Sequence, residues 1–181
     1  MASRTRRETA ADAPPGMSRL TAAAPAPVGR ERAVALLGAG ERHVWLGELI
    51  EAGVAGTDLD RYLIDLELRV GDFAPRLAFH KAAFIDIGPV SAVRGGPIRV
   101  GISWRAAGLA PLFPVFSGTL RWSNGQLRLD GFYAPPGGGI GMVADRMLLN
   151  VAARGTARWL LERIAAAMRG EAVQPQPSSS R

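Results

Sequence analysis

The chain has 181 residues, of which 48% are hydrophobic and 21% are charged, so it is long enough and apolar enough to bury the core of one domain. It contains no cysteine, which excludes disulfides, thiolate catalysis and cysteine-based zinc or iron–sulfur sites. Two histidines, His43 and His80, are too few for a histidine-rich metal site, and we expect neither a metal nor a cofactor.

The net charge of +6 comes almost entirely from arginine, and about half of the excess lies in residues 1–30. The rest of the chain has no dense basic block, so no specific nucleic-acid partner is predicted. No segment has the roughly 20 apolar residues that cross a bilayer. Arg6-Arg7 is followed by polar residues where an export signal needs an apolar segment, so we expect a cytoplasmic protein of unknown oligomeric state.

The two ends of the chain have the composition of disordered segments. Residues 1–29 are rich in Ala, Pro, Ser, Thr and Arg and lack periodic apolar positions, which predicts a disordered leader. Residues 170–181, which include Gln-Pro-Gln-Pro-Ser-Ser-Ser, are predicted to form a second disordered tail. Residues 30–169 then form a single domain.

Residues 30–56 show a helical spacing of apolar residues that is interrupted at Gly38-Ala39-Gly40. A dinucleotide-binding fingerprint needs a third glycine, but His43 stands there, and strands rather than a βαβ unit follow. The two glycines are therefore interpreted as a helix end.

From Asp60 onward the hydrophobic period changes to two, which is typical of strands with one apolar face. Three strands are predicted, at residues 62–70, 77–87 and 98–105. Asn124-Gly125 is the signal of a two-residue hairpin turn, because both residues of such a turn take positive φ. With this turn, Trp122 faces Leu127, Leu120 faces Leu129 and Gly118 faces Gly131, which predicts a hairpin over residues 116–133.

After the glycine- and proline-rich residues 135–139, the helical period returns and persists from Ile140 to Met168. Gly170 then ends the helix. A polar stripe recurs every four residues on one side of this helix, at Arg146, Asn150, Arg154, Arg158 and Glu162. The opposite, apolar side is expected to lie on the sheet. The order of elements predicts an α+β fold, in which a curved antiparallel sheet grips one long C-terminal helix and short helices lie near the N-terminus.

Several segments also resemble the START-like (SRPBCC) superfamily, the helix-grip group that includes polyketide cyclases and lipid-transfer proteins. The resemblance is carried by Leu112–Leu120, by Leu127–Gly137 and by Gly141–Asp145 with the helix that follows. Members of this group usually begin with a strand before two short helices. That strand is either absent here or lies in the leader near Ala26–Arg30. The resemblance implies an apolar ligand site between sheet and helix.

The expected function is therefore non-catalytic binding of a small hydrophobic or amphipathic molecule, such as a lipid, between the sheet and the helix. The residues expected to line this site are Phe116, Leu120, Trp122, Leu127, Leu129, Tyr133, Leu148, Leu149, Ala152, Thr156 and Trp159. Tyr133, Thr156 and Arg163 could orient the ligand.

Two alternatives remain open. A cyclase or dehydratase could use His80 and Asp86 as base and acid if both side chains point into the interior. Their strand alternation allows the solvent face instead, which we favour. The apolar groove could also receive a partner protein or a lipid surface, with the arginine-rich leader adding attraction.

Overall fold

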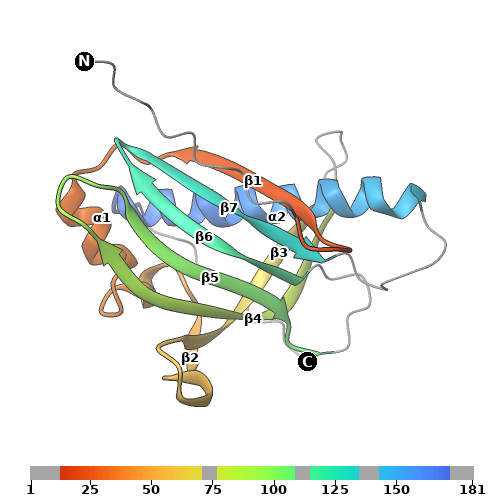
Figure 1. Cartoon of the computed structure of the whole chain (residues 1–181), viewed down its shortest axis with the longest axis horizontal. Helices are drawn as coiled ribbons and strands as arrows, with labels where there is room; N and C mark the ends of the chain where they lie inside the picture. The colour runs from red at the N-terminus through yellow and green to blue at the C-terminus, as the bar shows by residue number, and fades with distance from the viewer. Residues whose placement is uncertain (1–12, 71–76, 109–114, 135–142, 172–181) are drawn as a thin grey trace.

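The computed structural model describes residues 13–70, 77–108, 115–134 and 143–171, with backbone only for 68–70, 77–79 and 143–150. Figure 1 shows one curved sheet with a long helix, α2 (Val143–Met168), along its concave side. The sheet is antiparallel throughout, with the strand order β1-β7-β6-β5-β4-β3-β2. This arrangement confirms the predicted α+β class and the grip of the sheet on one C-terminal helix. The strands are β1 (Ser18–Pro25), β2 (Glu48–Glu51), β3 (Asp60–Val70), β4 (Leu77–Ala92), β5 (Ile98–Ala106), β6 (Val115–Ser123) and β7 (Gln126–Ala134).

The burial of the central strands follows the predicted alternation, so that one face of each strand is buried. In β5, for example, Ile98, Val100 and Ile102 are buried while the residues between them face outward. The β6–β7 hairpin has the predicted register, with Trp122 opposite Leu127 and the turn at Asn124-Gly125. Asn124 has φ 50° and Gly125 has φ 73°, the left-handed values that this turn requires.

The prediction of a disordered leader over residues 1–29 is wrong for part of that segment. Ser18–Pro25 forms β1, which pairs with β7 from Ser18 opposite Tyr133 to Pro25 opposite Gln126. The buried side chains of β1 are Leu20 and Ala24, and alanine gives too little hydrophobic contrast to mark a strand. The first strand of the helix-grip arrangement is therefore present, and it lies before residues 26–30. Residues 1–12 and 172–181 are outside the described residues.

The helical prediction for residues 30–56 is correct only at its start. Helix α1 (Arg30–Leu37) ends at Gly38, as the glycines indicate, and short 3-10 turns follow at Arg42–Val44 (η1) and Val54–Gly56 (η2). Between them, Glu48–Glu51 forms the edge strand β2 against β3. Its residues are all exposed, so no buried face imposes the period-two pattern that would have identified it.

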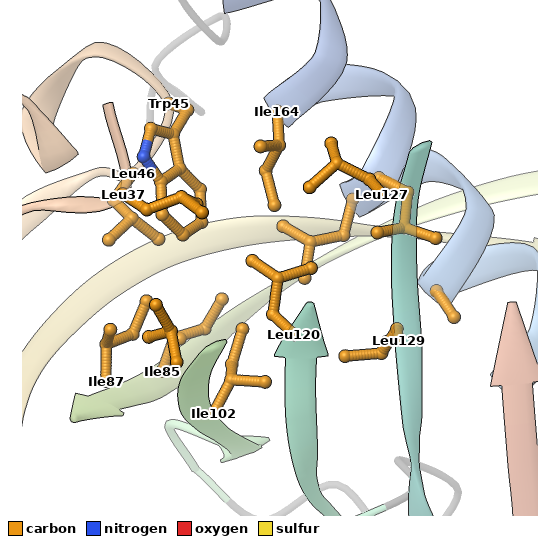
Figure 2. Packing of buried hydrophobic residues seen from close by; sticks show 14 of the residues in the cluster. Leu37, Trp45, Leu46, Ile85, Ile87, Ile102, Leu120, Leu127, Leu129 and Ile164 are labelled. Carbon is orange, nitrogen blue, oxygen red and sulfur yellow. The ribbon is translucent and has the colours of Figure 1, made fainter. Parts of the chain in front are cut away.

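One end of the sheet–helix interior is closed by α1 and η1. Figure 2 shows Trp45, Leu37 and Leu46 packed towards Ile85 and Ile87 of the sheet and towards Ile164 of α2. The indole Nε1 of Trp45 donates a hydrogen bond to the carbonyl of Leu36, so the ring is held as well as buried. This end of the interior is filled by large side chains.

The buried guanidinium of Arg42 fastens this cap to the sheet. It donates to the carbonyl of Leu37 (3.1 Å), to Oδ2 of Asp60 at the start of β3 (3.2 Å) and to the carbonyl of Gly88 in β4. One side chain thus satisfies three acceptors from three segments.

Replacing Arg42 with Met keeps the apolar stem but leaves these acceptors unpaired. We expect Arg42→Met to lower the free energy of unfolding by about 3 kcal/mol, measured by urea denaturation. Arg94→Met, in the exposed turn after β4, is the control and is expected to change stability by about 0.5 kcal/mol or less. Equal losses in the two variants would show that Arg42 has no special part in fastening the cap.

Candidate functional site

The candidate site lies between the concave face of the sheet and α2. Within the described residues, α2 approaches β1, β7 and β3 most closely, which are strands towards the two sides of the sheet. The middle strands β4, β5 and β6 lie further from the helix backbone. The helix therefore bridges the curved sheet, and the space beneath its middle must be occupied by long side chains or by a ligand.

A row of mostly aromatic side chains, here called the aromatic row, crosses the concave face of the sheet. Tyr133 of β7 is opposite Phe116 of β6, which is opposite Trp104 of β5; Ile85 and then Tyr62 continue the row on β4 and β3. All five side chains are buried. The rings of Trp104 and Phe116 stack with their centroids 4.0 Å apart and their planes at 19°. The row thus places aromatic and aliphatic side chains next to one another across five strands of the buried face.

Two glycines make room for the ring of Phe116. Gly118 and Gly131 lie opposite each other on β6 and β7, in the register predicted from the hairpin turn. A Cβ atom on Gly118 would lie 2.6 Å from Cζ of Phe116, and one on Gly131 would lie 2.7 Å from the same atom. The ring therefore lies over the glycine pair, and this position brings it against Trp104.

Helix α2 changes in character along its buried side. Ala152, Ala153 and Ala157 are buried near its middle, whereas Leu160, Leu161 and Ile164 are buried nearer its C-terminus, together with Ala165 and Ala167. The C-terminal half meets the filled end of the interior beside Trp45 (Figure 2). Thr156 is buried between Ala153 and Ala157 in the sequence, so small side chains flank it on the helix.

Among the described residues, two buried polar side-chain atoms of this interior have no hydrogen-bond partner. They are Nε1 of Trp104, on the sheet, and Oγ1 of Thr156, on the helix. The two residues are 1% and 0% exposed. A buried donor without a partner costs on the order of 1–3 kcal/mol, so such atoms are uncommon in native proteins unless they have a function or bind water. One unpaired polar atom therefore stands on each layer.

Nine of the eleven residues predicted to line the site are buried in the interior. They are all buried on the concave face or on the inner side of α2: Phe116, Leu120, Trp122, Leu127, Leu129, Tyr133, Ala152, Thr156 and Trp159. The side chains of Leu148 and Leu149 lie outside the described residues. Trp104 and Tyr62 were not among the predicted site residues. The alternation of their strands placed both on an apolar face, but only the sheet order puts them in one row with Phe116.

Trp122, predicted to line the site, and Arg163, predicted to orient the ligand, both hydrogen-bond to the backbone. Nε1 of Trp122 donates to the carbonyl of Ala26, which holds the segment that follows β1. Arg163 donates through Nε to the carbonyl of Trp45 (2.8 Å), and its guanidinium lies 5.6 Å from the ring centre of Trp159. Burial lowers the pKa of Arg163 from its ordinary value. The Trp122 and Arg163 side chains therefore hold backbone segments in place, and these hydrogen bonds are already made within the chain.

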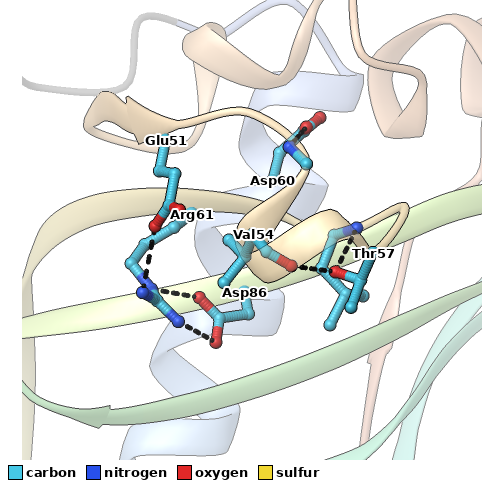
Figure 3. Close-up of polar contacts among 8 residues, drawn as sticks. Glu51, Val54, Thr57, Asp60, Arg61 and Asp86 are labelled. Atoms are coloured by element: carbon cyan, nitrogen blue, oxygen red, sulfur yellow. Dashed lines mark hydrogen bonds and ion pairs between the residues drawn. The ribbon is translucent and has the colours of Figure 1, made fainter.

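His80 and Asp86 lie on the outer, convex face of the sheet. Asp86 accepts two hydrogen bonds from Arg61, which also pairs with Glu51 (Figure 3). This pairing raises the pKa of Arg61, chiefly through its hydrogen bond to Asp86. The side chain of His80 is 49% exposed, with Nδ1 3.3 Å from Asp65 Oδ2. The hypothesis of an interior acid–base pair made by His80 and Asp86 is therefore wrong, because strand alternation directs both side chains outward.

Among the described residues, no group of three or more His, Cys, Asp or Glu side chains could hold a metal ion. No helix in the same part of the chain is long and apolar enough to cross a membrane. The buried polar or charged side chains there are Arg42 and Thr156. The chemistry of the described interior is consequently that of apolar contact with a few hydrogen bonds.

No protein-family model matches this chain, and no curated protein matches it. Solved structures that match include the crystal structure of DynU16, described as a protein in the dynemicin biosynthetic locus, at 21% identity and a TM-score of 0.41. The similarity covers 90% of this chain and 51% of the other, so this chain spans about half the length of the structure it matches. Any function must be inferred from the site itself.

The glycine pair under Phe116 can be tested directly. We expect Gly118→Ala and Gly131→Ala each to lower the free energy of unfolding by about 1–3 kcal/mol, because the new methyl group overlaps the Phe116 ring and neighbouring backbone. Gly101→Ala, on the outer face of β5 with open space around it, is the matched control and is expected to be neutral or slightly stabilising. Urea denaturation measures all three. A Gly118→Ala variant as stable as Gly101→Ala would contradict the proposed position of the ring.

Proposed function

We propose that this protein binds a small amphipathic molecule between the aromatic row and the middle of α2, without performing chemistry on it. The observation that carries the proposal is the pair of buried, unpartnered polar atoms on Trp104 and Thr156. An indole nitrogen can only donate, so the ligand would offer it an oxygen or nitrogen acceptor; a hydroxyl can donate or accept.

Apolar burial would supply most of the affinity. The rings of Phe116 and Trp104 on the sheet and the buried alanines of α2 would offer the ligand apolar surface on the two layers that carry the polar atoms. Moving apolar surface out of water contributes roughly 25 cal/mol per Å², before the costs of ordering the ligand are subtracted. The hydrogen bonds would then fix orientation, because an incorrect pose leaves the buried atoms unpaired.

Binding is favoured over a cyclase or dehydratase by the nature of the interior. General acid–base chemistry needs groups that exchange protons near neutral pH, such as histidine or a carboxylate. The fully buried side chains of the described interior include neither histidine nor a carboxylate; besides tyrosine and tryptophan, the polar ones are an arginine with three acceptors and a threonine. The alternative role as a protein or lipid docking module drew on the arginine-rich leader, whose first twelve residues lie outside the described residues.

Native mass spectrometry of the full chain, purified without denaturant from the cells that produce it, tests the proposal. We expect a species heavier than the chain by the mass of one small molecule, which is lost on acid unfolding. Only apo protein, together with no binding from a library of amphipathic carbonyl compounds, would overturn the proposal.

Thr156→Val separates stability from binding. The substitution keeps the shape of the side chain and removes the unpaired hydroxyl, so apo protein is expected to gain about 1 kcal/mol in the free energy of unfolding. The same change is expected to lower the affinity for the ligand identified by native mass spectrometry several-fold. Thr119→Val makes the same chemical change on the exposed face of β6 and is expected to leave ligand binding unaltered.

Trp104→Phe is the companion variant on the sheet. It keeps a ring that can stack on Phe116 but removes the N–H donor, so the loss of one hydrogen bond is expected to weaken the ligand by up to about tenfold. Calorimetric titration of apo protein with the ligand that native mass spectrometry identifies measures both variants. Unchanged affinity in both Thr156→Val and Trp104→Phe would place the ligand elsewhere.

A further inference from the structure

Three arginines stand side by side on the convex face of the sheet, on the opposite side from Trp104 and Thr156. Arg99 of β5 is directly opposite Arg121 of β6, and Arg121 is directly opposite Arg128 of β7. Neighbouring strands are about 4.8 Å apart, so three guanidinium groups are presented over a span of roughly 10 Å. Figure 1 shows these three strands running together through the middle of the sheet.

The row is short of counter-charge. Like charges directly opposite each other on a sheet are destabilising, and this row contains two such pairs. Arg128 is paired with Asp130, with Nε 2.8 Å from Oδ2. Oδ1 of Asp130 accepts from the hydroxyl of Thr21, so this acid is already shared. Among the described residues, Arg99 and Arg121 have no acidic partner.

The three arginines form one line across the strands. On one side the next outward-facing row contains Gly101, Thr119 and Asp130, and on the other side it contains Ser123 and Gln126. An acid and several hydroxyl or amide groups thus border the arginines. A long polyanion or a flat anionic surface would need positive charge that continues along the strands. The pattern suits a short ligand with two or three adjacent anionic groups.

We propose that Arg99, Arg121 and Arg128 bind the diphosphate group of a small molecule. A guanidinium offers a planar fork of N–H donors that matches the oxygens of a phosphoryl group, and such charge-assisted hydrogen bonds are about twice as strong as neutral ones. Two linked phosphoryl groups can bridge Arg99 to Arg121 and Arg121 to Arg128. The hydroxyls of Thr119 and Ser123 flank Arg121 along β6 and can donate to the remaining oxygens.

Titration of the full chain with sodium pyrophosphate, at constant ionic strength in an isothermal calorimeter, tests this site. We expect saturable binding that Arg121→Gln weakens by about tenfold or more, since Arg121 is central to both bridges. Arg154→Gln removes the same charge from an exposed position on α2 and is expected to bind within about twofold of the native protein.

Unfolding in dilute buffer without pyrophosphate provides the second measurement. Arg121→Gln is expected to be at least as stable as the native chain, because it removes two like-charge contacts. The proposal is overturned if sodium chloride of equal ionic strength stabilises the protein as much as pyrophosphate does, or if Arg121→Gln and Arg154→Gln lose equal affinity. Binding to phosphatidylglycerol vesicles without binding to pyrophosphate would likewise overturn it, by showing a lipid surface as the partner.

Discussion

The structure depends on the way α2 spans a curved sheet. The helix touches strands towards both sides of the sheet and lies further from the strands in the middle. Because the backbones separate there, the two layers can be joined only by large side chains or by a guest molecule. The sheet supplies aromatic rings on its concave face, while the helix supplies alanines near its middle. The interior beneath the C-terminal end of the helix, beside Trp45 and Ile164, is filled by closely packed side chains.

This difference in packing bears on Nε1 of Trp104 and Oγ1 of Thr156, the two buried polar atoms without partners among the described residues. Trp122 and Trp45 are also buried tryptophans, and each donates its N–H to a backbone carbonyl. The chain therefore satisfies an indole where the indole serves only the fold. The indole N–H of Trp104, whose ring stacks on Phe116, has no such partner among the described residues. A side chain that departs from the rule followed by its neighbours is a reasonable place to look for function.

Much of the central fold could be predicted because local signals there agree. The Asn124-Gly125 turn sets the β6–β7 register, and period-two alternation independently directs Leu120 and Leu129 inward. The long C-terminal helix was predicted within a few residues of its observed start, as were the exposed positions Arg154, Arg158 and Glu162. Strands β1 and β2 could not be predicted, because one buries mainly alanine and leucine and the other buries nothing. Their pairing is decided by distant partners that no local pattern reports.

The same limit applies to the candidate site. Apolar spacing identified the residues that face the interior, and nine of the predicted positions lie there. Strand order, which the loops between β3, β4 and β5 do not reveal, brings Tyr62 and Trp104 into one row with Phe116. Alternation alone left the direction of His80 and Asp86 open. The ion pair of Asp86 with Arg61 now shows which face they occupy.

The position of β1 has a consequence for biosynthesis. Ser18–Pro25 leaves the ribosome early, yet its partner β7 ends more than a hundred residues later, at Ala134. Until that hairpin is made, the first strand has no edge to join, and α2 is synthesised later still. Pairings between such distant segments are slow to form, and the unpaired strands are exposed to association with other chains in the meantime. The nascent protein therefore has a long interval in which a chaperone would be of use.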